Sequence, residues 1–308
     1  MYSTNIKQLS TEIRTPFLWR NGKILSWSEV SIDPGIHALH YGTGIFEGIR
    51  VFQNDSGVSK GFKTTEHYKR FSHSAASSGM NLDFTTDELC RATADIIEAN
   101  QLQNAYLRPL CIQSDGYEQM ASASGATTTF IMAFVLPDTI NRQIPVQKAT
   151  ISPFIKPKQN AQLFKSKNTG HYILISAAAR DAVSKGYNQA IFLDENQNVT
   201  EALTDNLFIV SNGVVITPPD EAPILLGITR ETLYELLIQD GFEVLKKDIS
   251  LSSLMEADEI FTSSTAGHIK AIGRVNNTII GDMQRVGPIT SRASRLLDKY
   301  ISMEIGKD

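Results

Sequence analysis

Two short segments of the chain contain a lysine and a glutamate that together suit cofactor chemistry. Lys167 lies in residues 167–172, and Glu201 lies in residues 200–208. A lysine amine can hold an aldehyde cofactor as a Schiff base, and a carboxylate at the cofactor's pyridine nitrogen keeps that nitrogen protonated. The two residues are 34 positions apart (201 − 167), which leaves room for a helix and a hairpin between them. The pair therefore predicts a site for pyridoxal 5'-phosphate.

The same two segments belong to a wider resemblance to the class IV aminotransferases, in particular to the branched-chain type. Four further motifs carry it, at residues 40–50, 106–110, 227–230 and 264–266. The resemblance runs from about residue 19 to about residue 297, which is nearly the whole chain. Each motif is weak alone. All six follow the order and nearly the spacing of the family, and this makes the match specific.

The resemblance implies an α+β fold of two domains with the cofactor in the cleft between them. We expect a small α/β domain over residues 1–136 and a larger, β-rich domain that binds pyridoxal 5'-phosphate over residues 147–308. Residues 137–146 would form the interdomain loop, because two prolines, an aspartate and an asparagine are typical of a linker.

Lys167 is the expected Schiff-base lysine, which anchors the cofactor and then moves a proton at the substrate α-carbon. Lys165 is a rival on sequence alone. The separations from Lys167 to Tyr172 and to Glu201 match the family pattern, and Lys165 does not reproduce them. The proton transfer requires an amine of lowered pKa, which burial and neighbouring cations can supply.

The resemblance also assigns the remaining cofactor contacts. Glu201 would pair with the pyridine nitrogen, and Tyr172 would bond to the phenolic oxygen. The phosphate needs cations and free backbone amides, and the first turn of a helix provides such amides. The expected phosphate ligands are Arg70, Ile228, Thr229 and Thr265.

Seven residues are expected to select the substrate. By resemblance, Arg108 receives the side-chain carboxylate of glutamate, Phe46 walls an apolar pocket, and Tyr106 helps to hold the α-carboxylate. Tyr41 is expected to reach in from a second subunit. The complete set is Tyr41, Phe46, Gly48, Tyr106, Arg108, Thr265 and Ala266.

Composition excludes several other classes of protein. The chain has 308 residues, of which 42% are hydrophobic and 20% charged, and a net charge of −4, so it has no basic surface for nucleic acid. The two cysteines, Cys90 and Cys111, give no disulfide framework, and the six histidines lack zinc-binding spacing. We find no membrane span and no apolar signal segment, so we expect a cytoplasmic protein without metal.

Local patterns place the elements that must hold these residues. Asn21-Gly22 predicts a hairpin, and Thr85 followed by Glu88 predicts a capping box at the start of a helix. Thr229 is the expected N-cap of a later helix. Further helices are expected over residues 65–80 and 172–185 and at the C-terminus, and strands over residues 46–52, 105–112, 128–135, 190–193, 206–210, 214–217 and 259–262.

The expected reaction is transamination of L-leucine, L-isoleucine or L-valine with 2-oxoglutarate, in a homodimer or larger oligomer. This is a reaction of branched-chain amino acid biosynthesis. Four departures from the family pattern leave the substrate open: residues 115–118, His171, Leu203-Thr204 and the short interdomain loop. The alternatives are a D-amino acid or (R)-amine transaminase, an aminodeoxychorismate lyase, or a non-catalytic binding protein on the same fold.

Overall fold

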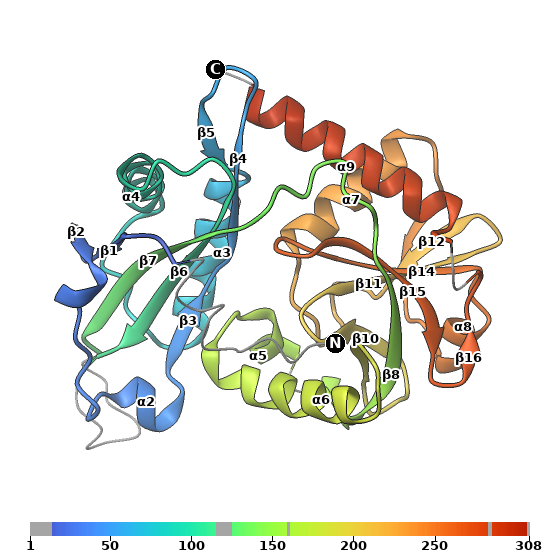
Figure 1. Ribbon diagram of the computed structural model, residues 1–308. Coiled ribbons are helices and arrows are strands. Elements are labelled where there is room, and N and C mark those ends of the chain that lie inside the picture. Colours follow the sequence, from blue (N-terminus) through green and yellow to red (C-terminus); the bar gives the residue numbers. More distant parts are fainter. Residues whose placement is uncertain (1–13, 115–124, 159–160, 283–284, 307–308) are drawn as a thin grey trace. The chain divides into compact units, whose positions relative to one another are not determined.

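The computed structural model describes residues 14–114, 125–158, 161–282 and 285–306, which fall into two compact units (Figure 1). Unit 1 comprises Met1–Asp138, Ser166–Gly170 and Ser302–Asp308. Unit 2 comprises Thr139–Lys165 and His171–Ile301. Each unit has helices packed on a sheet, so the fold is α+β, as predicted. Residues 115–118, one of the departures noted above, lie outside the described ranges.

Unit 1 is built on an antiparallel sheet in the order β2-β1-β7-β6-β4-β5, with β3 also paired to β6. The expected hairpin joins β1 and β2, and Asn21 and Gly22 both have positive φ (42° and 87°). The strands are β1 (Phe17–Arg20), β2 (Lys23–Ser26), β3 (Gly44–Phe46), β4 (Ile49–Gln53), β5 (Ser59–Gly61), β6 (Ala105–Gln113) and β7 (Thr127–Val135).

Helices α3 (Thr64–Ser77) and α4 (Thr86–Ala99) pack against this sheet. The capping box at Thr85 and Glu88 is confirmed, and it supplies acceptors for amides that the first helical turn leaves free. The core between helices and sheet contains Tyr68 and Phe71, both fully buried. Two shorter helices, η1 (Trp27–Glu29) and α2 (His37–Tyr41), complete the unit.

The expected single strand over residues 46–52 is wrong, because the structure breaks it at Glu47 and Gly48. The Glu47 N–H donates to the Pro109 carbonyl (2.9 Å), while its side chain turns inward and is completely buried. A Cβ at Gly48 would lie 1.9 Å from the Tyr106 hydroxyl oxygen, so only glycine fits beside that ring. The break brings a carboxylate to the interior of unit 1.

Unit 2 contains a mixed sheet in the order β10-β9-β8-β15-β14-β11-β12-β13, with β16 paired to β15. Strand β8 is parallel to both neighbours, and β12 is parallel to β13. The strands are β8 (Val146–Ile155), β9 (Gln189–Leu193), β10 (Val199–Ala202), β11 (Asn206–Ser211), β12 (Val214–Thr217), β13 (Val244–Lys246), β14 (Glu259–Ser264), β15 (His268–Val275) and β16 (Thr278–Ile279).

Helix α6 and the C-terminal helix lie where the sequence predicted helices, whereas the two short helices α5 and α8 were not predicted. Helix α6 buries Ala178 and Ala182 against β9, and Pro288 occupies the first position of the C-terminal helix, where proline is favoured. Thr229 is not the N-cap of α7, as we expected: Gly227 is, and Thr229 lies within the first turn. The helices of unit 2 are α5 (Ala161–Lys165), α6 (Tyr172–Ser184), α7 (Ile228–Gln239), α8 (Leu251–Met255) and most of α9 (Pro288–Gly306). The short helix η3 (Thr169–His171) and α9 each have residues in both units.

The shift of the α7 start has a steric cause. A Cβ on Gly227 would lie 1.8 Å from Asn206 Oδ1, and the same amide donates through Nδ2 to the Leu225 carbonyl (2.8 Å). The loop before α7 is therefore held close to β11, and the helix begins directly after the glycine.

Among the helices of the described ranges, none combines the length and apolar character needed to cross a membrane.

Candidate active site

The segment that carries Lys167 is fixed to unit 1 through its backbone. Phe46 donates its N–H to the Lys167 carbonyl (2.9 Å), and Lys167 donates its own N–H to Ser74 Oγ (3.0 Å), 93 positions away in the chain. Asn168 forms an antiparallel bridge with Ile45. These contacts hold residue 167 between β3 and α3.

The Lys167 amine lies among other cations. Its Nζ is 5.0 Å from the centroid of the Phe46 ring. Burial and the positive charges of Arg70 and Arg108 lower the pKa of this amine, and the charge of Glu47 acts in the opposite direction. An amine of lowered pKa is neutral more often at pH 7, and it is then a better nucleophile and base. Lys165, the rival, ends α5 in unit 2.

A buried carboxylate organises the positive charges of this region. Glu47 is bidentate with Arg70: Nε is 2.6 Å from Oε1, and Nη2 is 2.8 Å from Oε2. His67 Nδ1 is a further 2.8 Å from Oε2. Burial alone would raise the pKa of Glu47, but the charge of Arg70 and the hydrogen bonds from Arg70 and His67 hold it far below its ordinary range. Arg70 is thereby fixed in one orientation.

His67 completes this group in the neutral form. Burial lowers the pKa of His67, which favours the neutral ring. The neutral ring donates a hydrogen bond through Nδ1–H to the Glu47 carboxylate. Its Nε2 is buried and has no hydrogen-bond partner within the described part of the chain. A polar atom left in this state is suited to a ligand or a bound water.

The predicted substrate residues of unit 1 surround the same place. Arg108 Nη2 donates to the Tyr106 hydroxyl (3.1 Å), and the guanidinium lies over the Phe46 ring, 4.6 Å from its centroid. Arg108 Nε is buried without a partner among the residues described. Gly48 leaves the space that the Tyr106 ring occupies. An apolar wall and an incompletely satisfied cation therefore lie together near Lys167.

In unit 2, Glu201 is a buried carboxylate with both oxygens engaged. It lies on β10 and is 7% exposed. Lys156 Nζ donates to Oε1. Oε2 accepts from Asn206 Nδ2 (3.2 Å) and from the Leu225 N–H (3.1 Å). These donors hold the carboxylate in a fixed orientation, as a site for a cation requires.

Asn206 connects Glu201 to the predicted phosphate residues of unit 2. It contacts Gly227, whose position places Ile228 and Thr229 in the first turn of α7, where the amides have no intrahelical acceptor. It also pairs across the sheet with Ser263, at the end of β14. Thr265 and Ala266 form the turn from β14 to β15, which a hydrogen bond from Gly267 N–H to Ser264 Oγ closes (3.1 Å).

Two predicted tyrosines lie at helix ends. Tyr172 is the first residue of α6 in unit 2. Tyr41 is the last residue of α2 in unit 1, where its ring packs against His37 at a centroid distance of 4.6 Å and remains 40% exposed. Apart from these tyrosines, the contacts described above bring six predicted residues together in unit 1: Lys167, Arg70, Phe46, Gly48, Tyr106 and Arg108.

The sequence analysis missed three residues that structure the site. Glu47 lies inside the motif at residues 40–50, and His67 lies three residues before Arg70, but a glutamate in an apolar strand pattern gives no sign of a buried counter-charge. Lys156 has no local signal, because its partner is 45 positions away.

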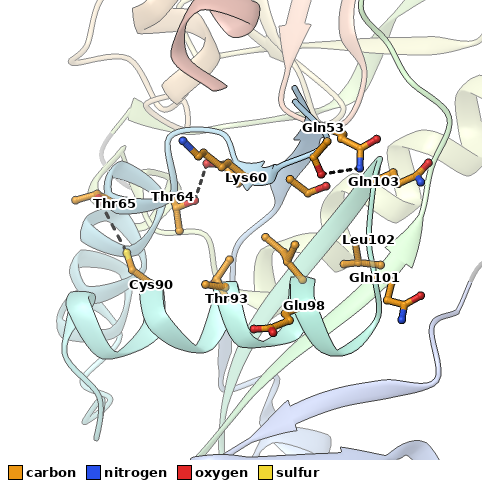
Figure 2. Close-up of a pocket in the computed structure, with 15 residues that line it drawn as sticks. Gln53, Lys60, Thr64, Thr65, Cys90, Thr93, Glu98, Gln101, Leu102 and Gln103 are labelled. Carbon is orange, nitrogen blue, oxygen red and sulfur yellow. Dashed lines mark hydrogen bonds between the residues drawn. The ribbon is translucent and has the colours of Figure 1, made fainter. Parts of the chain in front are cut away.

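A pocket in unit 1 lies apart from these residues. It has a volume of about 610 Å³ and lies beside α4 and β5, with Lys60, Thr64 and Cys90 among its lining residues (Figure 2). None of the predicted site residues lines it. Within the described ranges, no group of His, Cys, Asp and Glu side chains is arranged to hold a metal ion.

Comparison with known proteins agrees with this chemistry. Residues 44–274 match the family model of class IV aminotransferases. The branched-chain-amino-acid aminotransferase of Salmonella typhimurium is 33% identical over 288 residues, which cover 92% of each chain. The crystal structure of the Escherichia coli branched-chain amino acid aminotransferase superposes with a TM-score of 0.88 at 32% identity, over 94% of this chain and 96% of that one. The PLP-form of the branched-chain amino acid aminotransferase from Thermobaculum terrenum gives 0.86 at 26% identity, over 96% of each chain.

Proposed function

We propose, from the premise that the chain belongs to the class IV aminotransferase family, that it transfers the amino group of branched-chain L-amino acids to 2-oxoglutarate. The products are branched 2-oxo acids and L-glutamate. It is an enzyme, and its cofactor is pyridoxal 5'-phosphate. Relatives named branched-chain aminotransferases, similar over nearly their whole length, support this assignment.

The observation that carries the substrate assignment is the stacking of Arg108 on Phe46. The two side chains form one surface that is apolar on the ring and cationic at the guanidinium. An aliphatic side chain of leucine, isoleucine or valine can pack on the ring. The carboxylate of glutamate can pair with the guanidinium, whose Nε has no other partner in the described residues. A ping-pong transaminase needs both kinds of substrate in one place.

The residues present fit the cofactor. When bound, pyridoxal 5'-phosphate supplies a protonated ring that withdraws electrons from the substrate α-carbon. Glu201 is fixed by three donors and would hold the proton on the ring nitrogen. Tyr172 would donate to the phenolic oxygen. The phosphate ligands would be Arg70, held by Glu47, the first-turn amides of Ile228 and Thr229, and Thr265.

Lys167 has the central role in proton transfer. In the first half-reaction, Nζ takes the proton from the α-carbon of the amino donor. In the second half-reaction, it gives a proton to the α-carbon of the product amino acid. The lowered pKa of this amine favours the neutral form that the first step needs. Tyr106 and the amides of the Thr265–Ala266 turn would orient the substrate α-carboxylate. Gly48 keeps the Tyr106 ring in place.

Three finer points belong to the same proposal. The enzyme would work as a homodimer or larger oligomer in the cytoplasm, and the exposed ring of Tyr41 would reach the site of a second copy. The small domain, interdomain loop and large domain would span residues 1–136, 137–146 and 147–308. Nucleic acid and membranes are not expected partners.

A substrate panel tests the proposed function. L- and D-amino acids and (R)-amines are each supplied with 2-oxoglutarate, and glutamate is measured. We expect turnover with L-leucine, L-isoleucine and L-valine. Turnover confined to D-amino acids or (R)-amines, or conversion of aminodeoxychorismate without an amino acceptor, would contradict it.

A further inference from the structure

Lys156 is a buried cation in unit 2 that the mechanism above does not use. It follows β8 directly and is 2% exposed. Its N–H donates to the Leu193 carbonyl (2.9 Å), which fixes its backbone beside β9. Its ammonium group bonds to Glu201 Oε1 and lies near the faces of two aromatic rings, 5.2 Å from Phe164 and 4.9 Å from Phe192.

Such an arrangement needs a physical reason. A buried lysine and a buried glutamate both lose hydration, and a pair of well-packed neutral side chains is often at least as stable. Two aromatic faces offset part of the loss for Lys156, because the ring quadrupole attracts a cation. Among the described residues, the other oxygen of Glu201 accepts from neutral amide donors, those of Asn206 and Leu225. Lys156 is therefore the cation that pairs with the Glu201 carboxylate in the interior of unit 2.

We propose that Lys156 is a positioning residue that serves as the counter-ion of Glu201 while the cofactor is absent, and that shares this carboxylate with the pyridine nitrogen once the cofactor is bound. The inference rests on the proposed role of Glu201. Lys156 would then have opposite effects on the stability of the cofactor-free protein and on the affinity for the cofactor. Lys156 stabilises the cofactor-free protein, and it weakens the hold of Glu201 on the cofactor ring, because one carboxylate then serves two cations.

The test compares Lys156→Met with the wild type in cofactor-free and cofactor-loaded forms. We expect the substitution to lower the melting temperature of the cofactor-free form much more than that of the loaded form, each relative to wild type, because only the loaded form has another cation for Glu201. By linkage, the variant should bind pyridoxal 5'-phosphate about tenfold more tightly. Equal losses in both forms, or weaker binding, would overturn the proposal, since a purely structural lysine would give the first result and a direct cofactor ligand the second.

Two matched variants separate charge from packing. Lys156→Arg keeps the cation and should restore the stability of the cofactor-free form. The double variant Lys156→Met with Glu201→Gln removes both charges and should be more stable without cofactor than Lys156→Met alone, which also covers the case in which the single variant does not fold. A double variant no more stable than the single one would assign the effect to packing on Phe164 and Phe192 and would refute the proposal.

A cofactor analogue shows whether the effect passes through the ring nitrogen. Deazapyridoxal phosphate has carbon at that position and offers Glu201 no cation. We expect the tighter binding of Lys156→Met to disappear with this analogue, and its persistence would contradict the inference. If the wild type develops no visible absorbance band with pyridoxal 5'-phosphate, the proposed function fails. If the band forms but the affinity of Lys156→Met is unchanged, only the role of Lys156 fails.

Discussion

A buried counter-charge organises the surroundings of both Lys167 and Glu201, and its sign differs between the two places. Around Lys167, the two basic side chains of Arg70 and Arg108 gather in unit 1, and one buried acid, Glu47, holds the Arg70 guanidinium. Around Glu201, one acid is held in unit 2 by one buried base, Lys156, and by two amide donors. The first region keeps a surplus of positive charge, which suits phosphate and carboxylate groups. The second offers a fixed negative charge, which suits a protonated ring nitrogen.

The two lysines also differ in the charges that surround them. The Lys167 amine lies near Arg70 and Arg108, and together with burial they lower its pKa. Lys156 instead bonds directly to a carboxylate, and its ammonium group lies over two aromatic rings. Breaking one counter-charge at a time tests this comparison.

The largest effect is expected for Lys167→Ala. Loss of both the anchoring amine and the proton carrier should lower turnover by about 10⁴-fold or more. Lys165→Ala is the matched control, and it should retain most of the activity. Steady-state assays with L-leucine and 2-oxoglutarate measure both. A variant of Lys165 that is the more damaged of the two would reverse the assignment.

Glu201→Gln should follow, with a loss of roughly 10²–10³-fold in the rate of the α-proton step, since one charge in a dry site contributes a few kcal/mol. The cofactor should still bind through its phosphate. Single-turnover absorbance with L-leucine isolates this step, and Glu221→Gln provides an exposed control in the same unit. Near-normal rates would mean that Glu201 is not the partner of the ring nitrogen.

Glu47→Gln should affect stability and cofactor binding together. Removal of one partner of a buried pair leaves the Arg70 charge uncompensated, which costs about 3–5 kcal/mol in the free energy of unfolding. Glu66→Gln breaks only the exposed pair with Lys63 and should cost about 1 kcal/mol or less. Denaturant titrations give both values. A cost no larger than that of Glu66→Gln would show that Glu47 does not hold Arg70.

The same carboxylate predicts a pH dependence. The pKa of Glu47 is lower in the folded protein than its ordinary value of 4.5, so its stabilising contribution is fully present above about pH 4.5 and is lost as the pH falls towards the folded-state pKa. The difference in unfolding free energy between wild type and Glu47→Gln should therefore be constant from pH 7 to pH 5 and shrink in more acidic solution. A difference that shrinks between pH 7 and pH 5 would indicate another titrating group.

Arg108→Ala should have the smallest and most selective effect. The half-reaction with glutamate should slow by about 10–100-fold, the contribution of a charge-assisted hydrogen bond, and the half-reaction with L-leucine only slightly. Arg108→Lys keeps the charge without the planar fork and should fall between wild type and Arg108→Ala for glutamate. Cofactor absorbance follows each half-reaction separately. Equal losses in both would assign Arg108 to the α-carboxylate or to packing.

Local patterns in the sequence predicted most of the elements, and the motifs contain most of the residues that gather in unit 1. The hairpin at Asn21-Gly22 and the capping box at Thr85 depend only on neighbouring residues, so they could be recognised. The break at Glu47 could not, because its cause is the distant Arg70 and Tyr106. The start of α7 depends likewise on Asn206, which is remote in sequence.

The counter-charges escaped prediction for the same reason. Lys156 and Glu201 are joined by tertiary packing, and neither residue type nor spacing indicates the pair. Strand β8 itself was not predicted, because its sequence contains a proline and polar residues and lacks a clear alternation. The cofactor chemistry could thus be inferred from motifs, while the electrostatic support of each functional group required the structure.

The central claim is that the amine of Lys167, in the basic region of unit 1, carries the cofactor. Reduction of the loaded enzyme with borohydride, digestion and mass spectrometry identify the lysine to which the cofactor is attached. We expect the label on Lys167 alone. A label on Lys165 or Lys156, or on no lysine, would contradict it.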